Sequence, residues 1–388
     1  MKRLHPLDWI AIALLLAGII CVATGLLPRA DAEATIRRIL PLLLFLGTVV
    51  ILAELAALAE VFDVIAARVA ISARGNYPAL FLLCVAFASI TTITLNLDTT
   101  AILLTPVMLA LARKLRVDPL PMAMTTVWLA NTASLLLPVS NLTNLLAANR
   151  VGLAPLAFAQ RMWLPQLVAI GVTMVFLWLA YWRKAARLGP LAPHRPRDPV
   201  LFRIALAACG LFIVAVLVGL PLGVASGAAA GIVVLAFVVR DRAELRPGLL
   251  PWRLLVFVTG LFLVVQTIGR HGLDRIAGAL IGVDGGAEGA FRAGATGAAL
   301  SNLVNNLPSY VAGEAVVPIG NHVQLLALLV GTNVGPLATP WASLATLLWY
   351  ERCRSAGVTV PMRRFLLTGA GLALTCTAAT VAALLVQS

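Results

Sequence analysis

Apolar runs of about twenty residues fill most of this chain, and they leave few folds open to it. Of the 388 residues, 61% are hydrophobic and only 12% are charged, whereas a soluble domain is nearer half apolar and a quarter charged. A run of ~20 apolar residues crosses ~30 Å of hydrocarbon as a helix, and the ~10-residue alternating segments of a transmembrane β-barrel do not appear in the sequence. The composition predicts an all-α polytopic membrane protein.

The apolar runs predict about nine full spans. The first run follows a basic start, as the core of a signal peptide would, but it is longer than a usual signal core. We therefore expect it to be retained as the first span. The predicted spans lie at 9–27, 39–62, 121–147, 164–182, 201–218, 221–239, 251–269, 322–349 and 365–385.

Two further regions do not fit a single span. Residues 78–113 and 289–318 each hold an apolar leg, a polar centre and a second short apolar leg. This order predicts two re-entrant hairpins, because non-helical backbone at membrane depth survives only inside protein or beside a water-filled cavity. Two full spans, 121–147 and 322–349, are predicted to be broken helices. The residues expected to form the breaks and the second hairpin tip are Pro138, Pro308, Gly335, Pro336 and Pro340.

The two halves of the chain are related in sequence. The hairpin tips NLDTT (96–100) and NLPSY (306–310) align at an offset of 210, and the broken spans align without gaps at an offset of 202. In the broken spans the aligned pairs include Asn131 with Asn333, Pro138 with Pro340, Asn141 with Ser343, and Asn144 with Thr346. Five crossings separate the halves, so we expect inverted structural repeats. The expected parts are an N-terminal span and loop at 1–38, repeat 1 at 39–182, linker and scaffold spans at 183–250, and repeat 2 at 251–388.

The distribution of basic residues predicts the orientation in the membrane. The net charge of +13 comes from Lys and Arg in short segments between apolar runs, which is typical of the positive-inside bias rather than of a nucleic-acid-binding surface. With the N-terminus in the cytoplasm, 21 of the 29 Lys and Arg fall on the inner side. We therefore expect a multi-pass protein of the cell (inner or plasma) membrane with its N-terminus cytoplasmic and its C-terminus outside.

Inverted repeats that carry broken helices are typical of secondary transporters. Each break frees backbone groups that a continuous helix would use, and Asn, Ser and Thr side chains are expected to line it. Four polar clusters, two tips and two breaks, are predicted to converge near the midplane. The candidate substrate-binding residues are Asn96, Thr99, Thr100, Asn131, Thr132, Ser134, Asn141, Ser301, Asn302, Asn305, Asn306, Ser309, Asn333, Thr339 and Ser343.

Acidic residues inside a bilayer are costly and usually functional. Asp98 lies in the first hairpin tip, and the equivalent position in the second tip is Pro308. Asp98 is therefore the first candidate for proton coupling, followed by Glu54 and then Glu314. The alternative role for Asp98 is structural, as a carboxylate that caps the second helix of its hairpin.

Other classes of function find little support in the sequence. Five cysteines and four histidines are scattered without metal-ligand spacing, so we expect no metal site and no cofactor. A membrane-embedded enzyme would need a nucleophile with its base or clustered metal ligands, and no HExxH or GxSxG motif is found. We expect that the protein is not an enzyme.

The chain resembles the arsenical pump membrane protein family (ArsB) of the ion transporter superfamily. The resemblance lies in LNLDTTAILLTPV (95–107), ANTASLLLPVSNLTNLLAA (130–148), SNLVNNLP (301–308) and GTNVGPLATPWASLATLLW (331–349). It implies efflux of arsenite and antimonite, as neutral trihydroxides, in exchange for protons. It also implies partners, namely a second copy in a homodimer and, in some systems, a soluble ArsA-type ATPase. Some family members carry acidic residues where Asn131 and Asn333 stand, which gives Asp98 more weight here.

The residues themselves agree with a neutral, hydroxyl-rich substrate. Amides and hydroxyls exchange hydrogen bonds with a trihydroxide without burying a net charge, and no Lys or Arg stands in the four clusters. Two alternatives from the same superfamily stay open: a sodium-coupled anion symporter, in which Na⁺ supplies positive charge, and a sodium/proton antiporter that uses Asp98. Dependence on sodium separates them.

Overall fold

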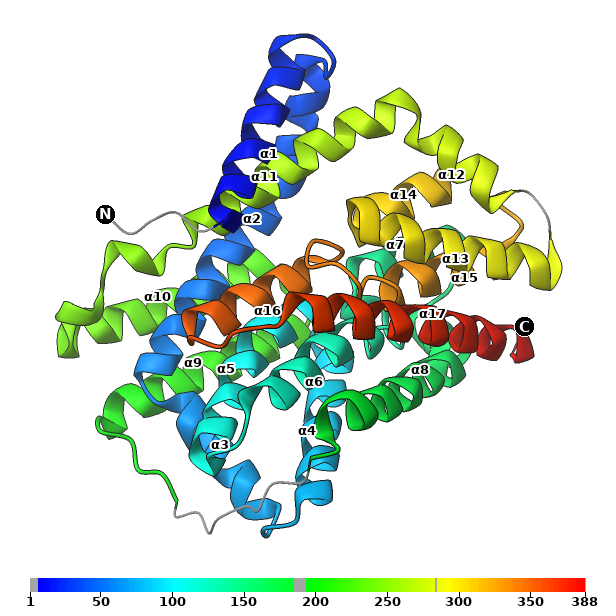
Figure 1. The fold of residues 1–388 in the computed structure, drawn as a ribbon. Helices are drawn as coiled ribbons and strands as arrows, with labels where there is room; N and C mark the ends of the chain where they lie inside the picture. Colours follow the sequence, from blue (N-terminus) through cyan, green and yellow to red (C-terminus); the bar gives the residue numbers. More distant parts are fainter. Residues whose placement is uncertain (1–5, 185–192, 283–284, 388) are drawn as a thin grey trace. The chain divides into compact units, whose positions relative to one another are not determined.

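The computed structural model describes residues 6–184, 193–282 and 285–387, and these residues form helices joined by short loops (Figure 1). Seven of the described helices are long and apolar enough to cross a membrane. They are Arg29–Leu58, Tyr77–Thr94, Pro155–Trp182, Pro199–Val216, Leu222–Arg240, Leu254–Gly272 and Met362–Val386. The expected all-α polytopic membrane architecture is confirmed.

The chain divides into two compact units. Unit 1 comprises Met1–Phe62 and Arg195–Leu273, and unit 2 comprises Asp63–His194 and Asp274–Ser388. The helices of unit 1 are α1 (Pro6–Ala23), α2 (Arg29–Leu58), α9 (Pro199–Leu217), α10 (Leu222–Arg240) and α11 (Trp252–Ile268), with short helical turns at Arg242–Glu244, Pro247–Leu249 and Gly269–Leu273.

Unit 2 contains both hairpins and both broken spans. Helix α3 (Val61–Ser72) begins two residues before unit 2 starts at Asp63. The other helices are α4 (Tyr77–Thr94), α5 (Leu97–Leu115), α6 (Pro119–Thr132), α7 (Leu142–Val151), α8 (Pro155–Leu177), α12 (Asp274–Ile281), α13 (Gly286–Val304), α14 (Asn306–Val316), α15 (His322–Val334), α16 (Leu344–Ser355) and α17 (Met362–Val386), with helical turns η1 (Pro138–Ser140) and η2 (Trp178–Trp182).

Hydrogen bonds and close backbone contacts hold unit 1 together. In Figure 1, α1 and α11 lie side by side, and a Cβ added to Gly260 of α11 would meet the backbone of Leu15 in α1. Helix α2 pairs with α10 through the hydroxyls of Thr48 and Ser226, 2.6 Å apart. Small residues at such contacts let membrane helices approach closely.

Short polar side chains start the helices that follow each interruption in unit 2. Asn96 caps α5 by accepting a hydrogen bond from the backbone N–H of Thr99 at 2.7 Å. Asn141 caps α7 and Ser343 caps α16 in the same manner. Such caps satisfy N–H groups that the first turn of a helix leaves without a partner, so the polar centres seen in the sequence are what allow each helix to restart.

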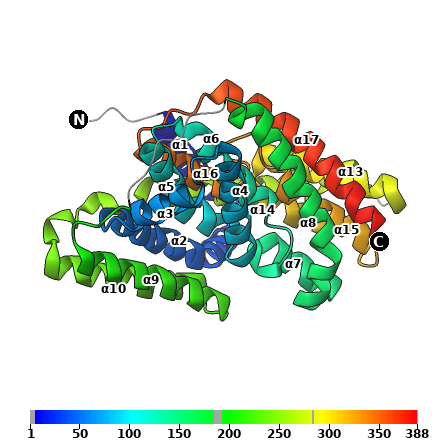
Figure 2. The same ribbon diagram turned by 90° about the horizontal axis from the view of Figure 1, so that it is seen from below.

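The second half of unit 2 is packed through glycine. A Cβ added to Gly331 of α15 would overlap the backbone of Gly294 in α13, and one added to Gly297 would lie 2.8 Å from the carbonyl oxygen of Leu328. Helices α13 and α15 therefore touch backbone to backbone. Figures 1 and 2 also show α8 and α17, the last helices of the two repeats, lying side by side.

The glycine contact between α13 and α15 gives the first prediction. The Gly331→Ala substitution should lower the free energy of unfolding by about 1–3 kcal/mol, because the new methyl group overpacks a tight contact. The check is the thermal unfolding midpoint of the purified protein in detergent. Gly171→Ala in α8 is the matched control, since an added Cβ there meets nothing within 4 Å. Equal midpoints for the two variants would show that α13 and α15 are not in close contact.

Candidate functional site

The first broken span is held open by a side chain from another helix. Helix α6 ends at Thr132, and the backbone that follows is not helical until η1. Gln166 of α8 accepts hydrogen bonds from the backbone N–H groups of Leu135 and Leu136 at 2.8 and 3.1 Å. Its amide nitrogen donates to the carbonyl of Thr132 at 3.0 Å. One buried amide thus satisfies three backbone groups that the break releases.

The second broken span is held in the same way by a different element. Asn302 of α13 accepts from the N–H groups of Ala338 and Thr339 at 3.0 and 3.1 Å, and it donates to the carbonyl of Gly335 at 2.7 Å. These three groups stand 203 positions after those bound by Gln166. This is one residue out of register with the offset of 202, so the two breaks show the same spacing of bonded groups rather than identical positions, and amides from unrelated places in the sequence bind them.

The two broken spans also touch each other in a reciprocal pattern. Asn131 donates to the hydroxyl of Thr346 at 3.3 Å, and Asn333 donates to the side-chain oxygen of Asn144 at 2.6 Å. Under the offset of 202, each contact is the image of the other. The same pair of aligned positions therefore meets twice, as a two-fold relation between the broken spans would produce.

Each hairpin tip is attached to the broken span of its own repeat. In the second half, Asn305 donates from its side chain to the carbonyl of Trp341 at 2.9 Å, and the N–H of Asn306 donates to the carbonyl of Ala342 at 2.8 Å. In the first half, the hydroxyl of Ser140 donates to the carbonyl of Ile93 at 2.7 Å.

Six polar side-chain atoms in the first half are buried without a hydrogen-bond partner among the described residues; Ser89 Oγ and Trp128 Nε1 lie outside the candidate set, and four belong to it. These four are Asp98 Oδ1, Thr99 Oγ1, Asn131 Oδ1 and Asn141 Nδ2. Buried polar groups are nearly always paired in native proteins, and each exception calls for an explanation. The set contains acceptors, a donor and a hydroxyl that can act as either, so it suits a small ligand that both donates and accepts hydrogen bonds.

Asp98 does not cap α5. Asn96 fills that position, and Asp98 lies in the first turn, partly buried. The capping role considered for Asp98 is therefore wrong, and its carboxyl group is left available for other chemistry. Glu54 lies in α2 of unit 1 and is also partly buried. The structure thus places the two candidate carboxyls in different units.

The remaining candidate residues divide between structural and unassigned positions. Several hydroxyls bind the backbone of their own turn or helix: Thr100, Ser134, Ser301 and Ser309. Thr132 bonds to Trp128 and Thr173, and Thr339 bonds to the carbonyl of Asn302. The hydrogen bonds of these hydroxyls are made within the protein, so the hydroxyls stabilise the backbone around the tips and breaks. Of the helix-break residues, Pro138, Gly335, Pro336 and Pro340 are buried, and Pro308 is partly exposed in the first turn of α14.

Sequence reasoning missed Gln166 as part of the site. It is an amide within an apolar span, and it is 2% exposed. A single polar residue within an apolar span indicates a structural or functional role, although the sequence does not say which backbone groups it binds. The sequence analysis also did not single out Thr143, whose hydroxyl donates to Asn333 Oδ1 at 2.6 Å and so pairs that amide within the protein.

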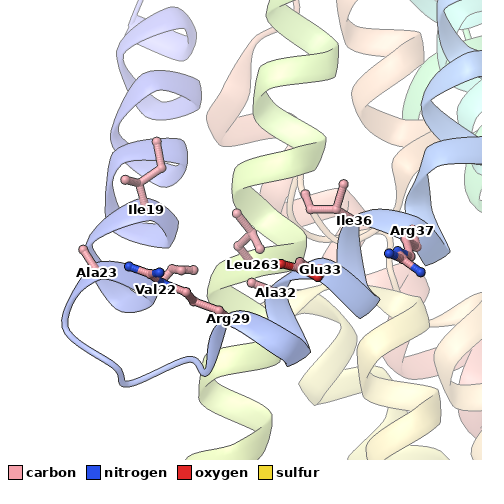
Figure 3. A pocket seen from close by; sticks show the side chains of 9 residues that line it. All are labelled: Ile19, Val22, Ala23, Arg29, Ala32, Glu33, Ile36, Arg37 and Leu263. Atoms are coloured by element: carbon pink, nitrogen blue, oxygen red, sulfur yellow. The ribbon is translucent and has the colours of Figure 1, made fainter.

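A separate pocket of about 580 Å³ opens in unit 1 (Figure 3). Its walls come from α1, the start of α2 and Leu263 of α11, and its charged side chains are Arg29, Glu33 and Arg37. None of its nine lining residues belongs to the hairpin tips or the breaks. Its open, largely apolar walls differ from the amide- and hydroxyl-rich surroundings of the breaks.

The family model and the curated relatives that this chain matches are described as membrane transport proteins. Residues 4–345 match a family model described as Citrate transporter. The chain is 30% identical to the arsenical pump membrane protein of Yersinia enterocolitica and 29% identical to that of Escherichia coli K12, with 74% of this chain and 72% of each relative covered. Among solved structures, the YdaH transporter of Alcanivorax borkumensis aligns with 98% of this chain and 97% of its own, at 14% identity and a TM-score of 0.46.

The geometry of the first break predicts a large effect of Gln166→Met. This substitution keeps the side-chain length but leaves three buried backbone groups without partners, each worth about 1–3 kcal/mol. The free energy of unfolding should fall by about 2 kcal/mol or more, measured as a lower thermal midpoint in detergent. Gln160→Met, at an exposed position on the same helix, should change it by less than about 0.5 kcal/mol. An equally small effect at Gln166 would contradict its role in holding the break.

Proposed function

The chain belongs to the family of membrane transporters that includes the arsenical pump membrane proteins, and on this premise we propose that it exports arsenite and antimonite, as neutral trihydroxides, in exchange for protons. The observation that carries the proposal is the set of buried, unpartnered polar atoms at Asp98, Thr99, Asn131 and Asn141. A trihydroxide offers both O–H donors and oxygen acceptors, which matches the mixed character of this set.

The chemistry of the surroundings favours a neutral substrate. The side chains that form the hydrogen bonds described for the breaks and tips are amides and hydroxyls, and none of them is Lys or Arg. Burying an anion there without a positive partner would be costly. The family model that matches is described as Citrate transporter, so a cation-coupled carrier of carboxylate anions is the second candidate. It would need a bound cation to supply the positive charge.

Asp98 is proposed to exchange the coupling proton. Its buried Oδ1 has no hydrogen-bond partner in the described chain, so the carboxyl gains or loses a proton without breaking an existing bond at that atom. When the carboxyl is ionised, its buried oxygen is an uncompensated acceptor, and either a proton or a substrate hydroxyl relieves that cost. Proton and substrate then compete for the same group, which is the simplest basis for exchange.

Alternating access is the proposed transport mechanism. The hairpins and broken spans all lie in unit 2, and this supports a moving part distinct from a scaffold. We infer an elevator-like movement of this part, inverted repeats at 39–182 and 251–388, an N-terminus inside and a C-terminus outside. Homodimer formation and assistance by a soluble ArsA-type ATPase are part of the same proposal.

Proton coupling through Asp98 is tested by arsenite uptake into everted membrane vesicles. An inside-acidic pH gradient, without ATP or sodium, should drive uptake by the wild type and not by Asp98→Asn, because an amide cannot release a proton in this range. Arsenite counterflow at equal pH should survive in the variant, since it needs binding and movement but no net proton transfer. Glu54→Gln tests the second candidate carboxyl, and Asp241→Asn, at an exposed position, is the control.

The outcomes separate the alternatives. Equal gradient-driven uptake by wild type and Asp98→Asn would remove Asp98 as the coupling group and leave the exporter in place. Loss of uptake in Glu54→Gln alone would move the role to Glu54. Uptake that requires sodium, or uptake of citrate in place of arsenite, would contradict the proposed substrate and favour the cation-coupled anion carrier.

A further inference from the structure

The two reciprocal contacts between the broken spans are not equivalent in their hydrogen bonding. Both side-chain atoms of Asn333 are paired: Nδ2 donates to Asn144 and Oδ1 accepts from Thr143. Asn131 donates to Thr346 and to the carbonyl of Val127, but its Oδ1 is buried with no partner in the described residues. One contact is closed by the protein itself, and the other retains a free acceptor.

The sequence explains this difference. Thr143 supplies the hydroxyl that pairs with Asn333 Oδ1, and at the offset of 202 its counterpart is Ala345. Ala345 is fully buried and has no donor to offer Asn131. The free acceptor at Asn131 is thus a consequence of one residue difference between otherwise matching backbones.

A second difference concerns the helix caps after the breaks. Ser343 caps α16, and its hydroxyl is 2.8 Å from that of Thr346. Its counterpart Asn141 caps α7 with Oδ1, which leaves a spare donor, Nδ2, buried and unpartnered within the described chain. A serine would cap the helix as well, so the asparagine adds a donor that capping does not need.

The hairpins differ in the same direction. Hairpin 2 is fixed to its break by Asn302, Asn305 and Asn306, whose side chains and backbone make the bonds described above. In hairpin 1, the tip side chains Asp98 and Thr99 each retain a buried atom with no partner among the residues described, whereas the tip of hairpin 2 retains one such atom, the hydroxyl of Tyr310.

We propose that the substrate binds between the tip of hairpin 1 and the first broken span, and that the matching place in the second half is filled by the protein's own side chains. The substrate's O–H groups donate to Asn131 and Asp98, and its oxygen accepts from Asn141. This inference rests on the proposed function. It narrows a site spread over two repeats to one asymmetric site in the first repeat.

The test exchanges residues between the repeats, so that each new side chain is one the fold already carries at the equivalent position. Ala345→Thr gives Asn131 the donor that Asn333 already has. The KM for arsenite, from initial uptake rates in everted vesicles, should rise about three- to tenfold, as expected for one competing hydrogen bond. The thermal midpoint is measured alongside, because two added heavy atoms at this fully buried position cost about 1–3 kcal/mol unless the new hydrogen bond offsets them.

Two further variants keep the test decisive. Asn141→Ser copies Ser343, keeps the cap and removes the spare donor, so KM should again rise about three- to tenfold. It decides the matter if Ala345→Thr does not fold. The reverse exchange, Thr143→Ala, removes the donor to Asn333, and it should lower the thermal midpoint while leaving KM unchanged.

Each result has a defined meaning. Higher KM for Ala345→Thr and Asn141→Ser, with an unchanged KM for Thr143→Ala, supports the asymmetric site. Unchanged KM in the first two variants, or the same rise in all three, overturns the inference while an active wild type keeps the proposed function. Wild-type vesicles that take up no arsenite or antimonite remove the proposed function and this inference with it.

Discussion

Broken helices within a membrane protein require that every released backbone group find a partner, and the arrangement of unit 2 follows from this requirement. In hydrocarbon, water cannot replace the missing i to i+4 bonds, and each unsatisfied group costs several kcal/mol. Gln166 and Asn302 supply these partners in the same way. The side-chain oxygen of each accepts hydrogen bonds from two backbone N–H groups, and its nitrogen donates to one backbone carbonyl. An amide is the side chain suited to this task, because it is neutral and carries both a donor and an acceptor.

The two amides come from different elements, and this breaks the symmetry of the repeats. Gln166 fastens the first break to α8, whereas Asn302 fastens the second break to hairpin 2. The second hairpin and its break therefore form one hydrogen-bonded body, while the first hairpin is attached through the bond from Ser140 to Ile93. Two halves that align in sequence thus differ in how their hairpins are fastened, because a few side chains make different hydrogen bonds.

Much of the fold could be predicted from the sequence because its signals are local. Long apolar runs specify spans, and capping residues such as Asn96, Asn141 and Ser343 mark where helices restart. The equivalence of residues in the two broken spans could also be predicted, because the spans align without gaps at an offset of 202. The hydrogen bonds made by Gln166 and Asn302 could not be predicted from the sequence, because tertiary packing brings together residues about 30 to 37 positions apart. The capping role considered for Asp98 failed for a local reason: Asn96 stands two residues earlier, where the cap belongs.

The repeat alignment also bears on the proposed site. Some equivalent positions carry the same residue, such as Asn131 with Asn333 and Pro138 with Pro340. Buried atoms without a partner occur in both halves of the described chain, six in the first and four in the second. Those at the candidate site residues include Asp98, Asn131 and Asn141, whose counterparts are Pro308, Asn333 and Ser343. At Asp98 and Asn141 the first half has a carboxyl or amide group that the second half lacks. At Asn131 the acceptor stays unpaired because Ala345 of the second half lacks the hydroxyl that Thr143 of the first half offers to Asn333. A buried polar atom without a partner lowers stability, so keeping several of them in one repeat is costly for folding alone. A ligand with hydroxyl groups, or a transferable proton, compensates for that cost only while it is bound, which is the behaviour required of a group that must also let its ligand go.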